Sequence, residues 1–105
     1  MDAFAISLSG LQAASTGVSV TANNVANVNS KDYRAKRLDL EEQREGGVQE
    51  SSLTESQEST VPGGSNVDLA TEFTNLMVQS NAYGANLKVI QTQNQILGTA
   101  MDLKV

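Results

Sequence analysis

Apolar residues recur at alternating steps of four and three along the last third of the chain, from Asn66 to Val105. The positions of this stripe are Leu69, Phe73, Leu76, Ser80, Tyr83, Leu87, Ile90, Asn94, Leu97 and Met101. Because an α-helix turns once in about 3.6 residues, this spacing keeps the stripe on one face of a helix. A period of about 3.5 residues kept over several heptads is typical of a coiled-coil seam. The pattern predicts a helix of nearly 60 Å, at about 1.5 Å per residue, that needs a long partner.

The start of this predicted helix carries the expected signals. Ser65 can act as the N-cap, and Asp68 lies three residues later, as in a capping box. Asp68 and Glu72 also place negative charge at the positive end of the helix dipole. We therefore place the start of the second helix at about Ser65.

Residues 2–28 repeat the four-three spacing, in Phe4, Leu8, Leu11, Ser15, Val18, Ala22 and Val25. A second stripe, one residue earlier, holds only small or short side chains, and we call it the small stripe: Ala3, Ser7, Gly10, Ala14, Gly17, Thr21 and Asn24. Glycine inside a helix costs about 1 kcal/mol relative to alanine, so Gly10 and Gly17 need a reason other than helix propensity. Small residues let another helix backbone come close. The alternative is that the two glycines simply make this a weak helix.

Both helical segments lack the charged face that a helix exposed to water usually has. Up to Ser30 the only charged side chain is Asp2, and residues 66–105 contain only Asp68, Glu72, Lys88, Asp102 and Lys104. Uncharged polar faces suit a helix that is packed on several sides, where an unpaired buried charge is costly. Two helices of one chain cannot cover each other on all sides. The pattern therefore predicts an assembly of several subunits.

Four asparagines, Asn23, Asn24, Asn27 and Asn29, crowd the end of the first helical segment. Asparagine favours helix ends and turns, which accounts for Asn29. The other three keep to the helical pattern, and their amides can donate and accept hydrogen bonds to neighbouring helices. We therefore count Asn23, Asn24 and Asn27 as candidate interface residues.

Most of the charge lies between the two helical segments, in residues 31–64. A basic run at 31–37 precedes an acidic stretch at 39–58 in which Arg44 is the single cation, so the two blocks attract each other or a neighbouring subunit. Leu38-Asp-Leu40 alternates like a short strand, and Gly46-Gly47 can return the chain to Val48–Leu53 as a hairpin, although an isolated hairpin is only marginally stable. Residues 50–65 are rich in Ser, Glu, Thr and Gly and predict a mobile linker.

Composition argues against several classes of function. The net charge of -5 is unfavourable for binding nucleic acid. The absence of cysteine and histidine removes disulfides, thiolate chemistry, the commonest general base and the commonest zinc ligand. The carboxylate pairs Glu41–Glu42 and Asp68–Glu72 are better explained as solvated charges and helix-start charges than as a catalytic dyad. We expect no enzyme activity, no catalytic residues, no metal and no cofactor.

The sequence shows neither the pattern of a secretory signal peptide nor that of a membrane-spanning segment. Its first residues contain Asp2 and no Lys or Arg, unlike a secretory signal peptide. No stretch approaches 18 uninterrupted apolar residues, so we expect no direct membrane insertion.

Ser9-Gly-Leu-Gln-Ala-Ala, then Ala22-Asn-Asn-Val-Ala-Asn-Val-Asn-Ser30 and Tyr33, form one recognisable run. Ser65-Asn-Val-Asp-Leu-Ala-Thr-Glu-Phe73 and then Ala82-Tyr-Gly-Ala-Asn86 form another. The two runs resemble the N-terminal and C-terminal signatures of bacterial flagellar basal-body rod proteins, a family that includes the hook and other axial proteins. The chain departs from that pattern at Ser30, where threonine is usual, at Asp32, where glycine commonly precedes the tyrosine, and at Asn81, where arginine is common. Only about 35 residues separate the runs, which resembles short rod components rather than the hook.

We expect an all-α fold in which two long terminal helices, at 1–30 and 65–105, pack as an antiparallel coiled coil and form one discontinuous domain. Residues 31–64 are expected to be a short irregular or β-hairpin segment, partly mobile. The candidate assembly interface comprises Phe4, Leu8, Gly10, Leu11, Gly17, Val18, Asn23, Asn24, Val25, Asn27, Leu69, Phe73, Leu76, Tyr83, Asn86, Leu87, Ile90 and Leu97.

The resemblance implies a structural subunit of the flagellar rod that polymerises helically through its terminal helices into the drive shaft that transmits torque across the periplasm. Its implied partners are copies of itself, other rod and hook subunits, and the flagellar type III export apparatus, which would export it without a cleavable signal peptide. The alternative is a non-polymerising coiled-coil adaptor or export chaperone of that apparatus, whose helices should carry a charged solvent face. A helix at a membrane surface would favour Lys and Arg beside bulky apolar residues, and the first 30 residues have neither beyond Phe4.

Overall fold

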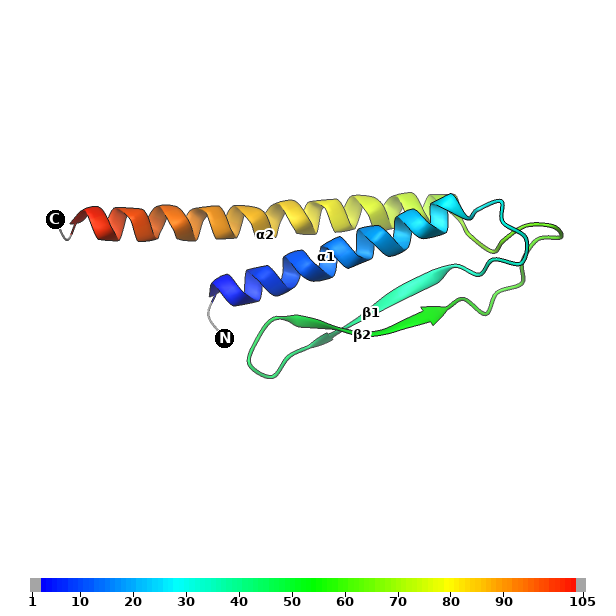
Figure 1. The fold of residues 1–105 in the computed structure, drawn as a ribbon, viewed down its shortest axis with the longest axis horizontal. Coiled ribbons are helices and arrows are strands. Elements are labelled where there is room, and N and C mark those ends of the chain that lie inside the picture. Colours follow the sequence, from blue (N-terminus) through cyan, green and yellow to red (C-terminus); the bar gives the residue numbers. More distant parts are fainter. Residues whose placement is uncertain (1–2, 104–105) are drawn as a thin grey trace.

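The computed structural model describes residues 3–103 as two antiparallel helices and one β-hairpin, and the hairpin lies against the first helix (Figure 1). Helix α1 spans Ala3–Ala26, strands β1 and β2 span Lys36–Glu42 and Val48–Glu55, and helix α2 spans Leu69–Leu103. The outermost predicted helix positions, residues 1, 2, 104 and 105, lie outside the described residues. The molecule is elongated, with extents of 69 × 25 × 14 Å.

The expectation of an all-α fold is wrong, because β1 and β2 pair as an antiparallel sheet. The strands join through a turn that contains Gly46 and Gly47, whose φ angles of 96° and 85° lie in the region that favours glycine. The hairpin suggested by Leu38-Asp-Leu40 and Gly46-Gly47 is therefore present. Residues 50–55, which we expected to begin a mobile linker, belong to β2.

Contacts with α1 explain why a hairpin of this size is ordered, since two strands alone are only marginally stable. Near the turn, the Val48 N–H donates a hydrogen bond to Ser9 Oγ at 3.1 Å. At the other end, the Lys36 N–H donates to Asn24 Oδ1 at 2.9 Å. No local sequence pattern encodes these two long-range contacts. The sequence therefore predicted only a marginal hairpin, whereas the structure contains an ordered sheet.

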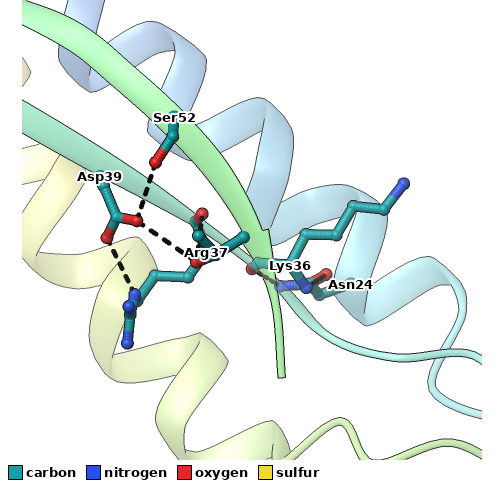
Figure 2. Close-up of polar contacts among 6 residues, drawn as sticks. Asn24, Lys36, Arg37, Asp39 and Ser52 are labelled. Carbon is teal, nitrogen blue, oxygen red and sulfur yellow. Dashed lines mark hydrogen bonds and ion pairs between the residues drawn. The ribbon is translucent and has the colours of Figure 1, made fainter. Parts of the chain in front are cut away.

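A cross-strand polar cluster also stabilises the hairpin (Figure 2). The Asp39 carboxylate accepts from Arg37 Nε at 3.0 Å, from Ser52 Oγ at 3.2 Å and from Thr54 Oγ1 at 3.3 Å. The pairing register places Arg37 opposite Thr54 and Asp39 opposite Ser52, followed by a bulge. Partial desolvation raises the pKa of the Asp39 carboxyl, but the hydrogen bonds and the Arg37 charge outweigh it and hold the pKa below its usual value.

The two helices run antiparallel, as predicted, but they do not meet through the apolar heptads. The buried residues of α1 belong mainly to the small stripe: Ser7, Ala13, Ala14, Gly17, Thr21 and Asn24. The large apolar side chains at Phe4 and Leu8 on α1, and at Leu69 and Phe73 on α2, are exposed. The seam within the chain is therefore small and polar, and the expectation of a coiled coil with an apolar seam is wrong in this respect.

Helix α2 begins later than its predicted cap. Asp68, not Ser65, is the N-cap, since its carboxylate accepts from the Ala70 N–H at 3.1 Å and from Thr71 Oγ1 at 3.1 Å. Ser65 is buried instead, and its hydroxyl donates to the Val28 carbonyl oxygen at 2.6 Å, which ties the approach to α2 to the end of α1.

The segment between β2 and α2 is fastened by two side chains. Arg34 Nη1 donates to the carbonyl oxygens of Ser56 and Glu58 at 3.1 and 3.0 Å. Asn66 Nδ2 donates to the Glu58 carbonyl at 2.9 Å, and Asn66 Oδ1 accepts from the Ala35 N–H at 2.6 Å. These bonds hold residues 56–66 against the start of the hairpin.

Candidate assembly surfaces

Asn24 joins α1, β1 and α2 at one buried point. Its side-chain Nδ2 donates to the Lys36 carbonyl oxygen at 2.8 Å and to Glu72 Oε1 at 3.0 Å. Its Oδ1 accepts from the Lys36 N–H and from the Tyr33 hydroxyl, both at 2.9 Å. With four bonds the amide has used its two N–H donors and both lone pairs of its oxygen. Asn24 is 1% exposed, and Figure 2 shows it beside Lys36.

Glu72 is the buried charge of this junction. It is 5% exposed, and its Oε2 has no hydrogen-bond partner among the described residues. Desolvation raises the pKa of the nearby Tyr33 hydroxyl, and the negative charges of Glu72 and Glu55 raise it further. The sequence-based interpretation treated Glu72 only as a helix-start charge and did not include Tyr33 among the candidate residues.

The other asparagines of the run lie at the end of α1. Asn27 Nδ2 donates to the Asn23 carbonyl oxygen at 2.8 Å and to Asn23 Oδ1 at 3.1 Å. The Ser30 hydroxyl donates to Asn27 Oδ1 at 3.0 Å. These bonds, like those of Asn24, are made within the chain.

Heptad spacing on the two helices places polar side chains of α2 against the small stripe. A Cβ atom on Gly10 would lie 2.7 Å from Asn86 Nδ2, and one on Gly17 would lie 3.0 Å from Gln79 Nε2. Asn24 contacts Glu72 seven residues further along. The two glycines are therefore needed for the close approach of α2. A polar stripe in the sequence could have indicated this face of α2: Glu72, Gln79, Asn86 and Gln93 recur at steps of seven. The sequence-based prediction considered only the apolar stripe.

The apolar members of the candidate interface lie outside this seam. Phe73 is 52% and Leu97 60% exposed, and Phe4, Leu8, Leu69, Tyr83 and Leu87 are also exposed. Leu11, Val18, Val25, Leu76 and Ile90 are half-buried. Exposed Met77, Val78 and Ile96 extend the apolar surface of α2 beyond the predicted stripe. The structure thus leaves the heptad faces of both helices accessible.

A cleft of about 1230 Å³ lies between the hairpin and the helix pair. Its apolar lining includes Ile6, Leu38, Leu40, Val48 and Val78. Its polar lining includes Glu72, Gln79 and Asn86. Within residues 3–103, no group of three or more Asp, Glu, His or Cys side chains is placed to hold a metal ion.

Helix α1 is long and apolar enough to cross a membrane by length and composition. The sequence-based prediction did not include this property, because it considered only uninterrupted apolar stretches. Core helices of soluble proteins and N-terminal signal sequences share the property. In this chain the small stripe of α1 packs on α2, and its Asn24 is bonded to the start of the hairpin and to Glu72.

Two family models match the chain, one at each end. Residues 4–34 match the model described as flagella basal body rod protein. Residues 63–103 match the model described as flagellar basal body rod FlgEFG protein C-terminal. The matched segments contain α2, all of α1 but Ala3, and the residues Asn24, Tyr33 and Glu72, whereas the hairpin lies between them. No curated protein matches the chain.

Proposed function

Because the chain belongs to the flagellar basal-body rod family, we propose that it is a structural subunit that polymerises helically through its two helices into the drive shaft of the rod. In that position it transmits motor torque across the periplasm, and its partners are further copies and other rod or hook subunits. The exposed apolar stripes of α1 and α2 carry this proposal. The proposal includes export by the flagellar type III apparatus.

The internal seam explains why these stripes remain available. Small and polar residues already join α1 to α2, so the larger side chains are not needed for that contact. Soluble monomers rarely expose large continuous apolar surfaces unless these bind a partner. Burying such surface between subunits is worth about 25 cal/mol per Å² of apolar area.

The size of the core leads to the same conclusion. Ala13 and Ala14 are the buried apolar side chains among the described residues, and neither buries much surface. Chains with cores this small usually need oligomerisation or another staple. Assembly would bury the apolar surface that the single chain leaves exposed. A stack of elongated subunits is also a suitable shape for a shaft.

Sedimentation of the purified chain over a wide concentration range tests the proposal, with electron microscopy of the largest species. We expect association that grows with concentration and ends in rods or protofilaments. Phe73→Asp should abolish it, because an aspartate in an apolar interface leaves an unpaired charge. Gln91→Asp, an equally charged change at an exposed polar position of the same helix, is the matched control. A chain that stays monomeric throughout contradicts polymerisation and favours the adaptor or chaperone.

A membrane-inserted α1 is the second candidate, favoured by the length and hydropathy of that helix. It requires α1 to leave α2, which breaks the bonds of Asn24 and Thr21. Flotation with phosphatidylethanolamine–phosphatidylglycerol vesicles separates the two candidates. Polymerisation predicts that the chain stays at the bottom of the gradient, and co-flotation supports insertion.

A further inference from the structure

Helix α2 extends well beyond the helix it packs on. Gly10 faces Asn86, so the antiparallel register brings the start of α1 opposite Gln93. The ten residues from Asn94 to Leu103, which we call the overhang, continue α2 past the start of α1 (Figure 1). At about 1.5 Å per residue the overhang is roughly 15 Å long. Ile96 and Leu97 on it are among the most exposed apolar residues of the described chain.

The cleft beneath the hairpin is large enough for a segment of polypeptide. Its volume of about 1230 Å³ exceeds the roughly 300–1,000 Å³ of pockets for small molecules. Along α1 its lining runs from Ile6 to Thr21, which corresponds to about 22 Å of helix. A 15 Å helical segment therefore fits within its length. Leu40 and Val78, on opposite walls, are 50% and 61% exposed, so the apolar walls are open.

The chemistry of the overhang matches that of the cleft. From Asn94 to Met101 the overhang carries no charged residue, so burying this part of it leaves no ion unpaired. Ile96 and Leu97 suit the apolar walls, and the amides of Asn94 and Gln95 can donate hydrogen bonds. The cleft is lined by side chains whose amide oxygens can accept them, among them Gln79 and Asn86.

We propose that the overhang of one copy lies in the cleft of the next copy. This inference rests on the proposed function and specifies one of the contacts through which copies join. The overhang cannot enter the cleft of its own chain, because it is the continuation of α2, whose first half forms one wall of that cleft. Donor and acceptor are different surfaces of the same chain, so the contact is heterologous. Such contacts propagate into open helical filaments unless the rotation between copies closes a ring.

Two complementary variants test this contact. The first, Ile96→Asp with Leu97→Asp, damages the overhang and leaves the cleft intact. The second, Leu40→Asp with Val78→Asp, damages the cleft and leaves the overhang intact. The control, Leu53→Asp with Val89→Asp, places the same charges at exposed positions of the hairpin and α2 that do not line the cleft. Circular dichroism verifies that all three keep the helix content of the wild-type chain.

We expect each damaged variant alone to be monomeric at concentrations where the wild-type chain and the control polymerise. Their equimolar mixture should form a 1:1 dimer and nothing larger, because one intact overhang and one intact cleft remain. If the wild-type chain itself does not assemble, the proposed function fails and this inference with it. If the wild-type chain assembles and the damaged variants assemble equally well, or their mixture forms no dimer, the inference is overturned while the proposed function stands.

Disulfide cross-linking gives an independent readout, since the chain has no cysteine of its own. Leu97→Cys with Val78→Cys places two thiols about 28 Å apart on one helix, too far for a bond within one chain. Oxidation of the assembled variant should give a ladder of multimers on a denaturing gel. Leu97→Cys with Val89→Cys is the control, also too widely spaced for an internal bond. An equal ladder from the control would overturn the proposed docking.

Discussion

Asn24 of α1 donates a hydrogen bond to Glu72 of α2 across 3.0 Å, although 48 residues separate them in the sequence. The same amide nitrogen also donates to the Lys36 carbonyl oxygen, and the amide oxygen accepts from Tyr33 and Lys36. One side chain thus fixes where the first helix ends, where the hairpin starts and where the second helix lies. The end of the molecule at which α1 leads into β1 and β2 leads into α2 depends on it.

Asn24→Asp should therefore destabilise the free subunit. The change removes the donors to Lys36 and Glu72 and places a carboxylate against the Glu72 carboxylate. Each lost partner costs roughly 1–3 kcal/mol, so we expect the free energy of unfolding to fall by about 3 kcal/mol or more. Chemical denaturation followed by circular dichroism measures this.

Asn27→Asp is the matched control for that experiment. It loses the bonds to Asn23 at the half-buried end of α1, and we expect a decrease of about 1 kcal/mol or less. Adding Glu72→Gln to Asn24→Asp should recover part of the loss, since a glutamine amide can donate to the new aspartate. Equal effects of Asn24→Asp and Asn27→Asp would show that the bonds of Asn24 add no more stability than those of Asn27.

The helices could be predicted from the sequence, but the contact between them could not be assigned to the right residues. A four-three spacing identifies a helix face and does not say which subunit covers it. The apolar stripe of Phe73 and Leu97 was the obvious candidate for the internal seam, yet it is exposed, and the seam is formed by the stripe of Gly10 and Gly17. The small stripe was predicted to face a helix, and that helix is α2 of the same chain.

The hairpin shows a different limit. Its turn could be found from Gly46-Gly47, but the length of β2 could not, because Ser and Glu residues give no strand pattern. Its order comes from Ser9 and Asn24, which lie far away in the sequence. Tyr33 and Glu72 were missed as members of the junction for the same reason: nothing local distinguishes a buried Glu72 from a solvated helix-start charge.

Substitution of glycines at the seam and elsewhere on the helices should have opposite effects on the free energy of unfolding. Gly17→Leu raises helix propensity, but the new side chain would displace Gln79, which accepts a hydrogen bond from Thr21 Oγ1 at 3.0 Å. We expect overpacking to dominate and the free energy of unfolding to fall by about 1–3 kcal/mol. Gly84→Ala meets nothing within 4 Å and should raise it by up to about 1 kcal/mol. Thermal unfolding of both variants measures this, and stabilisation by Gly17→Leu would contradict close packing at this site.

Asp32 has a left-handed backbone conformation of the kind that glycine adopts most readily. Its φ is 58°, and its N–H donates to the Gly64 carbonyl oxygen at 2.9 Å. Aspartate tolerates the left-handed region better than most residues, whereas a β-branched residue does not. We expect Asp32→Val to lower the free energy of unfolding by about 1–2 kcal/mol and Asp32→Gly to preserve or raise it. Lys31→Val, next to it, is the control and should change stability by less than about 0.5 kcal/mol.

Acid should weaken the hairpin through Asp39. Its pKa is lowered in the folded chain, so its stabilising contribution is present above the unfolded pKa of 3.8 and is lost as the pH falls through the folded pKa. The difference in unfolding free energy between the wild-type chain and Asp39→Asn should be constant near neutral pH and shrink below pH 3.8. Denaturation curves from roughly pH 6 to pH 2 test this. A difference that stays constant to the acid end would show that the bonds to Arg37, Ser52 and Thr54 do not favour the ionised form.

High pH should weaken the junction of Asn24, Tyr33, Lys36 and Glu72 by ionising Tyr33. Desolvation and the charges of Glu72 and Glu55 raise its pKa above 10.0 in the folded chain. The folded state therefore holds the phenolic proton more tightly, and this contribution is fully present below pH 10.0 and is lost as the pH rises through the folded pKa. In a Tyr83→Phe background, Tyr33 is the single tyrosine, and ultraviolet titration reports it alone.

We expect the Tyr33 midpoint in the folded chain to lie above that in denaturant. Glu72→Gln should move it part of the way back, since desolvation, the larger cause, remains. Tyr33→Phe removes the donor to Asn24 Oδ1 and should lower the free energy of unfolding at neutral pH by about 1 kcal/mol. The loss should vanish at a pH high enough to ionise Tyr33 in the wild-type chain, because the phenolate no longer donates that bond. A folded midpoint equal to or below the unfolded one would contradict the hydrogen-bonded, partly desolvated Tyr33 at this junction.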